Sequence, residues 1–345
     1  MTSFRPALAV TCGEPAGIGP DVTLLSWDQR AAFELPPFYL RGDPEFFRAR
    51  AARLGLDIPV VICTPQTAAH VFDDALPVVP TGRAIEDHPG APAQTTGASV
   101  IASIDACVDD VRQGLAAAVV TNPISKKVLY DAGFRHPGHT EYLGELATRF
   151  APGPFLPVML LAGPKLMVVP VTIHVPLMSV PQLLTAKLIA DTARIVHADL
   201  VTRFGLDHPR IAVAGLNPHA GEGGSMGTED RDLIAPVLEV LKDEGLNVSG
   251  PWPADTLFHE AARQTYDVVL GMYHDQVLIP VKTIGFDDTV NVTLGLPFVR
   301  TSPDHGTAFD IAGTGRARPD SFAAAVRMAD ALGRNDTLNK DDKAA

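Results

Sequence analysis

The chain has few cysteines, no excess of basic residues and no long uninterrupted apolar run. Its three cysteines, Cys12, Cys63 and Cys107, show no Cys-X-X-Cys spacing, which excludes a disulfide framework and predicts reduced thiols in the cytoplasm. The net charge of −12 leaves no basic face, so no nucleic-acid partner is expected. The most apolar stretch, 155–177, is broken by prolines, glycine and lysine. A spanning helix needs about 20 uninterrupted apolar residues, so we expect no membrane partner and interpret this stretch as two short strands joined at 163–165.

Several familiar motifs are also missing. Gly13, Gly17 and Gly19 do not have the GxGxxG spacing, and no GxxxxGK[ST] or HExxH occurs. These absences argue against an ordinary Rossmann nucleotide site, a P-loop and a zinc protease of the HExxH type. The turn at 13–20 is left with two interpretations, a structural turn at a strand end or a turn that contacts a ligand.

Short apolar runs alternate with helical patterns along the chain, which predicts an α/β fold with a largely parallel sheet. The 345 residues suffice for two domains or for one large α/β unit with a cleft. The expected strands include 7–12, 38–41, 59–63 and 117–121. The expected helices include 44–54, 96–114, 185–204 and 230–245.

Three histidines, His174, His219 and His274, each follow an apolar run, at 167–173, 210–216 and 267–273. Taken singly, each histidine is more often a hydrogen-bonded core or surface residue than a ligand. Together they share one topological position, and ligands of α/β proteins collect outside the carboxyl ends of the strands. We therefore predict one divalent-metal site with positions left open for substrate; three imidazoles favour zinc, and harder cations remain possible.

Other polar residues stand near these histidines. Asp275 directly follows His274, a common arrangement for orienting a ligand histidine. Lys282, Asn291 and Arg300 follow His274 at intervals of nine residues, and cations there are natural partners for a phosphate or carboxylate in an acidic protein. Gly138-His-Thr-Glu141 offers either a ligand contact or a helix start with Thr140 as N-cap.

Taken together, the motifs resemble those of the 4-hydroxythreonine-4-phosphate dehydrogenase family of vitamin B6 synthesis, in unchanged order from about Leu8 to Ala325. The motifs are Thr11-Cys-Gly-Glu-Pro-Ala-Gly-Ile-Gly-Pro20, Gly138-His-Thr-Glu141, Asn217-Pro-His-Ala-Gly-Glu-Gly-Gly224, Pro253-Ala-Asp-Thr256, Met272-Tyr-His-Asp-Gln276, Asn291-Val-Thr-Leu-Gly-Leu-Pro297 and Arg300-Thr-Ser-Pro-Asp-His-Gly-Thr307. A more distant resemblance links the segment from His305 to Gly313 to the adenosine-binding loop of isopropylmalate and isocitrate dehydrogenases.

The resemblance implies a fold of the isocitrate/isopropylmalate dehydrogenase type, with two α/β domains around a cleft and NAD or NADP bound without GxGxxG. The first domain would comprise 1–137 and 307–345, with a cofactor loop near 304–315. The second, 138–306, would carry the metal and the dimer interface. A homodimer with its active site at the interface is implied as well.

The resemblance also assigns roles to residues. Its metal ligands are His174, His219 and His274, holding one zinc, magnesium or cobalt ion. Its substrate contacts are His139, Thr140, Lys282, Asn291 and Arg300. Its cofactor contacts fall on His305, Gly306, Thr307 and Asp310. Asp255 and Asp275 are the candidates for accepting the hydroxyl proton, unless either only orients a ligand histidine.

The implied reaction is a metal-dependent, NAD(P)-linked oxidation of the small phosphorylated substrate 4-phosphohydroxy-L-threonine. Decarboxylation to 3-amino-2-oxopropyl phosphate would follow, in pyridoxal 5′-phosphate biosynthesis. One alternative is a dehydrogenase of a four-carbon phosphorylated sugar acid, a threonate or erythronate 4-phosphate; a remoter one is a metal-dependent phosphohydrolase. One departure from the family pattern is Asn122, where we expect a glycine.

Overall fold

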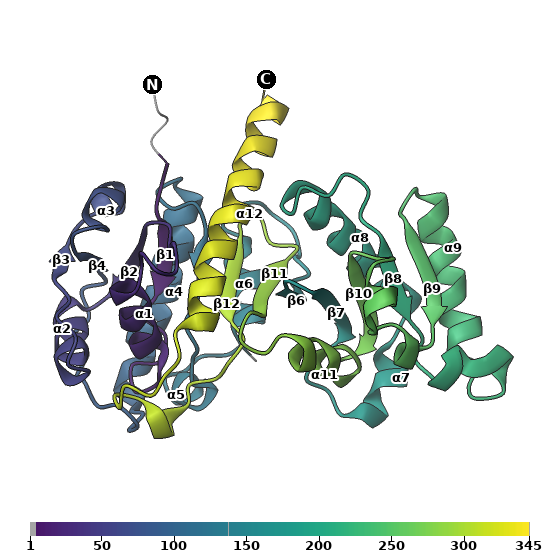
Figure 1. The fold of residues 1–345 in the computed structure, drawn as a ribbon, viewed down its shortest axis with the longest axis horizontal. Coiled ribbons are helices and arrows are strands. Elements are labelled where there is room, and N and C mark those ends of the chain that lie inside the picture. Colours follow the sequence, from purple (N-terminus) through teal and green to yellow (C-terminus); the bar gives the residue numbers. More distant parts are fainter. Residues whose placement is uncertain (1–4, 137, 345) are drawn as a thin grey trace. The chain divides into compact units, whose positions relative to one another are not determined.

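Strands and helices alternate along the chain, which confirms the expected α/β class (Figure 1). The computed structural model describes residues 5–136 and 138–344. These fall into two compact units. Unit 1 comprises the described residues up to Pro157 together with Leu296–Thr337, and unit 2 comprises Val158–Gly295 with the described residues after 337. No helix in the described part of the chain is long and apolar enough to cross a membrane.

Unit 1 is built on parallel strands in the order β3-β4-β2-β1-β5-β12. Their bounds are β1 Leu8–Thr11, β2 Phe38–Gly42, β3 Val60–Ile62, β4 Leu76–Pro80, β5 Val119–Val120 and β12 Arg300–Pro303. The helices of this unit are α1 Gly19–Asp28, α2 Pro44–Arg53, α3 Pro65–Val71, α4 Gly97–Arg112, α5 Lys126–Asp131 and α6 His139–Ala147, and α12 Asp320–Ala344 starts in it.

Unit 2 has strands in the order β11-β6-β7-β10-β8-β9. Their bounds are β6 Val158–Gly163, β7 Leu166–Thr172, β8 Ile211–Ala214, β9 Val248–Trp252, β10 Val268–Tyr273 and β11 Val290–Leu294. β6 and β7 form an antiparallel hairpin around Pro164 and Lys165, which confirms the expected strand pair. From β7 onward the order β7-β10-β8-β9 is parallel throughout. The helices are α7 Val180–Leu183, α8 Ala186–Thr202, α9 Ala235–Asp243, α10 Glu260–Arg263 and α11 His274–Ile284.

Local chemistry sets several helix ends. The Asp43 side chain accepts a hydrogen bond from the Glu45 amide at the start of α2, and Thr185 caps α8 in the same way. The helix expected over 230–245 is divided into a π-helical turn at Asp230–Ile234 and α9. Pro236 lies in the first turn of α9 and has no amide hydrogen, so the regular hydrogen-bond ladder cannot run through it.

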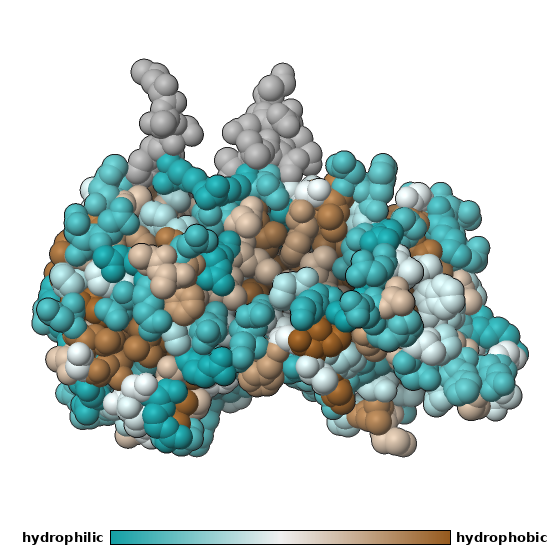
Figure 2. Space-filling model, viewed as in Figure 1, coloured by the Kyte–Doolittle hydropathy of each residue, from teal (hydrophilic) through white to brown (hydrophobic). Residues whose placement is uncertain are grey.

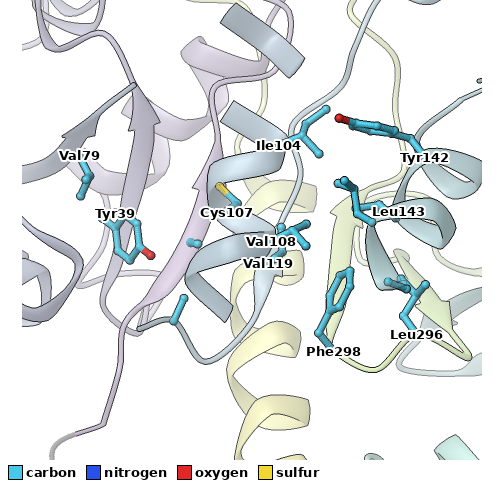
Figure 3. Close-up of a cluster of buried hydrophobic side chains, with 14 of the residues drawn as sticks. Tyr39, Val79, Ile104, Cys107, Val108, Val119, Tyr142, Leu143, Leu296 and Phe298 are labelled. Atoms are coloured by element: carbon cyan, nitrogen blue, oxygen red, sulfur yellow. The ribbon is translucent and has the colours of Figure 1, made fainter. Parts of the chain in front are cut away.

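The boundaries of the units differ from those expected at 137/138 and 306/307. They fall at 157/158 and 295/296, because helix α6 packs its apolar face into unit 1. Figure 3 shows Tyr142 and Leu143 of α6 beside Ile104 of α4, with Phe298 close by. Burial of this apolar surface attaches α6 and the chain around β12 to the first unit.

We predict that Ile104→Ala lowers the free energy of unfolding by about 2–5 kcal/mol, because the truncation leaves a cavity in the buried cluster of unit 1. Ile104 has no exposed surface. Chemical denaturation measures the change. The matched control is Ile62→Ala, because Ile62 is 58% exposed in the same unit and should cost far less. Equal losses in the two variants would contradict this account of the core.

Candidate active site

Four neighbouring strands of unit 2 end along one edge, and each end is followed by a residue singled out from the sequence. His174 follows β7, His274 begins α11 directly after β10, His219 lies in the turn after β8, and Asp255 lies in the short 3₁₀ turn η5 (Ala254–Thr256) after β9. Because these strands are parallel, their carboxyl ends meet on the same edge. The expectation that each histidine follows a strand is confirmed.

His174 and His274 lie close together. Their ring centroids are 5.6 Å apart. The strands that carry them are neighbours, with Thr172 paired to Tyr273. In addition, the Thr172 hydroxyl donates to the Met272 carbonyl at 2.7 Å, which ties the two strand ends to each other.

Asp275 contacts the ring of His274. Its Oδ1 lies 2.6 Å from Nδ1 of the imidazole. A carboxylate there accepts the Nδ1 proton and leaves Nε2 with its lone pair. This is the geometry of a carboxylate that orients a metal-binding histidine.

His219 lies in a strained turn. Residues Pro218–Gly224 carry a run of left-handed backbone angles, with φ of 53° at His219, 51° at Ala220 and 40° at Glu222. His174 also has a positive φ, of 51°. Each such angle in a non-glycine residue costs about 1–3 kcal/mol and persists only where the surroundings hold it, most often at functional sites.

The turn is anchored by Asp230, a residue that sequence reasoning missed. The buried Asp230 carboxylate accepts hydrogen bonds from the amides of Leu216, at 2.7 Å, and Asn217, at 3.1 Å. It also accepts one from the Asn217 side chain at 2.9 Å. A carboxylate at the start of a helical pattern, directly after a glycine-rich loop, was the available signal.

The side chains at this edge are of the types that bind divalent metals: imidazoles on neighbouring strand ends, with a carboxylate hydrogen-bonded to one of them. The described residues contain no group of three His, Cys, Asp or Glu side chains placed closely enough to hold an ion. The structure thus brings His174 and His274 together but does not add His219 to them. The His219 side chain is 67% exposed, and its nearest carboxylate is that of Glu222 at 3.9 Å.

Two of the expected substrate residues, His139 and Arg300, lie near each other in unit 1. Arg300 is buried and donates from Nε to the Thr121 hydroxyl at 3.0 Å; burial lowers its pKa to about 10. Nε2 of His139 is buried without a hydrogen-bond partner. Loss of hydration, and then the charge of Arg300, hold the pKa of His139 well below 6.5. The site therefore pairs a charged guanidinium with a neutral imidazole.

The first turn of α6 carries His139 and Thr140, which confirms a helix start at this motif. The N-cap is Gly138, so the expectation that Thr140 would be the cap is wrong. In unit 2, Lys282 lies in the last turn of α11, and Asn291 lies on β11 opposite Leu161.

The loop at 304–315 follows β12 and packs on the turn at 13–20. The Thr307 carbonyl accepts a hydrogen bond from the Ile18 amide at 2.9 Å, and the Gly313 amide donates to Asp21 at 2.6 Å. A Cβ on Gly17 would come within 2.9 Å of the Thr307 carbonyl oxygen, so only glycine fits there. The turn at 13–20 therefore has a structural role, because it supports the loop at 304–315.

The four expected cofactor residues are spread along that loop. His305 contacts the Gly306 carbonyl through Nδ1 at 3.0 Å. Thr307 supplies the carbonyl that meets the turn at 13–20, and Asp310 is exposed in a single 3₁₀ turn, Phe309–Ile311.

A buried arginine holds this support in place and was also missed from sequence. Arg50 of α2 donates to Asp21 at 2.5 Å and to Asp87 at 2.7 Å. It also donates to the carbonyls of Pro15 and Gly17. The same Asp21 that accepts from Arg50 accepts from the 304–315 loop, so one ion pair links both segments.

Asn122, the departure from the expected glycine, has a structural explanation. Its side-chain amide donates to the Thr11 carbonyl at 3.0 Å and to the Thr23 hydroxyl at 2.9 Å, which joins β1 to α1. A Cβ on Gly13 would lie 2.5 Å from Cβ of Asn122, so the neighbouring glycine makes room for it.

Comparisons with known proteins agree with this fold. Residues 34–329 match the family of the pyridoxal phosphate biosynthetic protein PdxA. The chain is 59% identical to a 4-hydroxythreonine-4-phosphate dehydrogenase of Methylorubrum extorquens over 334 residues, which cover 96% of each protein. The crystal structure of 4-hydroxythreonine-4-phosphate dehydrogenase from Klebsiella pneumoniae superimposes with a TM-score of 0.84 at 34% identity, covering 96% of this chain and 99% of that one.

A solved terephthalate 1,2-cis-dihydrodiol dehydrogenase from Burkholderia xenovorans is similar too, with a TM-score of 0.64 at 29% identity over 94% of this chain and 97% of that one. The fold and the relatives define the class as an α/β oxidoreductase. Within that class, the chain belongs to the PdxA family.

We predict that His139 makes stability depend on pH. In the unfolded chain its pKa is near 6.5, and in the folded protein it is well below that value. As the pH falls through about 6.5, the unfolded chain takes up a proton that the folded protein does not. The free energy of unfolding should therefore decrease toward acid, by at most about 1.4 kcal/mol per pH unit.

Urea unfolding of metal-free protein between about pH 7 and about pH 5 checks this. His139→Gln should flatten the pH dependence relative to the wild type. The control is His208→Gln, which changes an exposed histidine. Identical slopes for wild type and His139→Gln would show that His139 does not carry the effect.

Proposed function

We propose that the protein oxidises 4-phosphohydroxy-L-threonine with NAD or NADP and one divalent metal. Decarboxylation to 3-amino-2-oxopropyl phosphate follows, as a step of pyridoxal 5′-phosphate biosynthesis. The observation that carries the proposal is the pair of His174 and His274, 5.6 Å apart on one strand edge with Asp275 behind it, in a chain of this family.

His174, His219 and His274 would hold the metal, as zinc, magnesium or cobalt. The chemistry supplied by the two bound groups is polarisation of the substrate alcohol by the metal and acceptance of hydride by the nicotinamide. A hydrogen bond to Asp275 would keep the proton of His274 on Nδ1, which leaves the lone pair of Nε2 available to the metal. Because Asp275 has that contact, Asp255, exposed in η5 after β9, is the remaining candidate to accept the hydroxyl proton.

Arg300, His139 and Thr140, with Lys282 and Asn291, would bind the phosphate and carboxylate of the substrate. With a pKa of about 10, Arg300 stays charged at neutral pH and can pair with an anionic group of the substrate. A neutral His139 can donate a hydrogen bond to the same anion. The orphaned Nε2 of His139 supports a polar ligand at this point, because buried polar atoms rarely lack a partner.

His305, Gly306, Thr307 and Asp310 would contact the dinucleotide. The support for this assignment is the loop at 304–315, whose backbone is fixed by Ile18 and Asp21 and whose Ala308 has a left-handed φ of 40°. A loop held this rigidly presents backbone groups to a ligand at little further entropic cost.

A homodimer with the active site at its interface fits the surface of unit 2. Leu177 and Met178, just after His174, are 66% and 86% exposed, and Ile279 and Phe286 are exposed on or next to α11. Figure 2 shows apolar surface over α11 and over the segment between β7 and α8. Exposed apolar side chains that gather beside a candidate site favour a partner surface there.

The decisive assay follows nicotinamide reduction with 4-phosphohydroxy-L-threonine, with and without a chelator. Side-by-side turnover of threonate and erythronate 4-phosphates separates the sugar-acid alternative. Release of inorganic phosphate without reduced nicotinamide would instead support a phosphohydrolase. Full activity of metal-free protein would refute the proposed metal dependence.

We predict that His219→Ala loses bound metal and turnover together, each by more than about a hundredfold, since removing a ligand should exceed the loss typical of its supporting residues. Metal content by elemental analysis and turnover are measured on the same sample. Circular dichroism should be unchanged, because the side chain is largely exposed. His208→Ala, at another exposed histidine, serves as control and should keep both properties.

We predict that Met178→Glu shifts the protein from dimer to monomer, because an unpaired carboxylate would have to be buried at the interface. Sedimentation velocity measures the state, and activity should fall as the monomer fraction rises. The control Ile62→Glu changes an exposed apolar residue of unit 1 and should leave the assembly intact. A Met178→Glu protein that stays dimeric would place the interface elsewhere.

A further inference from the structure

The end of strand β8 is held from two directions, and neither contact belongs to the proposed ligand set. On one side, Asp230 accepts the amides of Leu216 and Asn217. On the other, the Gln276 side-chain amide donates to the Gly215 carbonyl at 2.7 Å. The strand end that leads to His219 is therefore fixed at three successive residues.

Gln276 also reaches the neighbouring strand. Its side-chain oxygen accepts a hydrogen bond from the Met272 amide at 2.7 Å, two residues before His274. One amide side chain thus bridges β10 and β8, with its acceptor on the His274 strand and its donor on the strand that leads to His219. This bridge fixes the spacing between the two strand ends.

The packing at Gly215 leaves no room for a side chain between the strand end, Asp230 and the His219 turn. A Cβ on Gly215 would lie 2.6 Å from Oδ1 of Asp230 and 2.9 Å from Cα of Ala220. The carboxylate and the left-handed turn are therefore both in direct contact with the strand end. Because the turn is strained, it would relax toward ordinary backbone angles if its anchor were lost.

We infer that Asp230 and Gln276 are positioning residues that hold the strand end leading into the His219 turn, and that through this turn they set the affinity and geometry of the metal site. Both act on the same strand end: Asp230 accepts from the amides of Leu216 and Asn217, and Gln276 donates to the carbonyl of Gly215. The inference rests on the metal site of the proposed function. It assigns roles to two residues outside the proposed ligand set.

The test uses Co²⁺ alone, titrated into the full-length, metal-stripped protein in competition with a chromogenic chelator. Asp230→Asn replaces one of the two accepting oxygens with an NH2 donor, and Gln276→Met keeps the size of the side chain and removes both hydrogen bonds. Each variant should bind Co²⁺ at least tenfold more weakly, within the range of about 10–100-fold for groups that support metal ligands. Each should also show a changed visible absorption spectrum of the bound ion.

The double variant should lose less than the product of the two single losses, because both side chains act on the same strand end. Asp230→Glu, which keeps the carboxylate, should recover part of the affinity. The matched controls are Asp243→Asn and Gln264→Met, at exposed positions of unit 2, and both should bind as the wild type does.

The outcomes separate the inference from the proposed function. If the wild type does not bind Co²⁺, the proposed metal site is wrong. If the wild type binds, and the folded Asp230→Asn and Gln276→Met variants bind with unchanged affinity and spectrum, the inference is overturned and the proposed function stands. If Asp230→Asn does not fold, Gln276→Glu decides, because it keeps the acceptor for Met272 and loses the donor to Gly215; unchanged Co²⁺ binding in it would overturn the inference.

Discussion

The parallel pairing of β7, β10, β8 and β9 is the constraint on which the candidate site depends. Parallel strands point their carboxyl ends to the same edge, so the residues that follow them lie along that edge, although the chain visits these strands in a different order. His174 and His274 are separated by a hundred residues of sequence and yet lie ring to ring. The chemistry of the edge is thus a consequence of backbone hydrogen bonding.

The two units support their functional loops by the same means, a buried charged side chain that binds loop backbone. In unit 2, Asp230 satisfies amides at the base of the His219 turn. In unit 1, Arg50 satisfies carbonyls of the turn at 13–20 and, through Asp21, supports the loop at 304–315. A buried charged group needs hydrogen bonds to offset its lost hydration, and because loop backbone supplies them here, each group also commits its loop to one conformation.

Local sequence patterns predicted much of this correctly. The strand before each histidine, the hairpin between β6 and β7 and the long helices α4 and α8 follow from apolar periodicity and helix-capping chemistry. Two expectations differ from the structure for reasons that apolar periodicity does not show. Pro236 divides the helix expected over 230–245, and the apolar face of α6 attaches residues after 138 to unit 1.

By itself, the sequence determined the α/β alternation, the three strand-end histidines and membership of a dehydrogenase-like family, because these depend on patterns within short segments. Only the tertiary structure decided that His174 and His274 meet, that burial keeps His139 neutral beside Arg300, and that Asp230 and Arg50 anchor the loops. Such contacts join segments far apart in the chain. Burial and pairing, which set the charge state and conformation of these groups, exist only once the strands have packed.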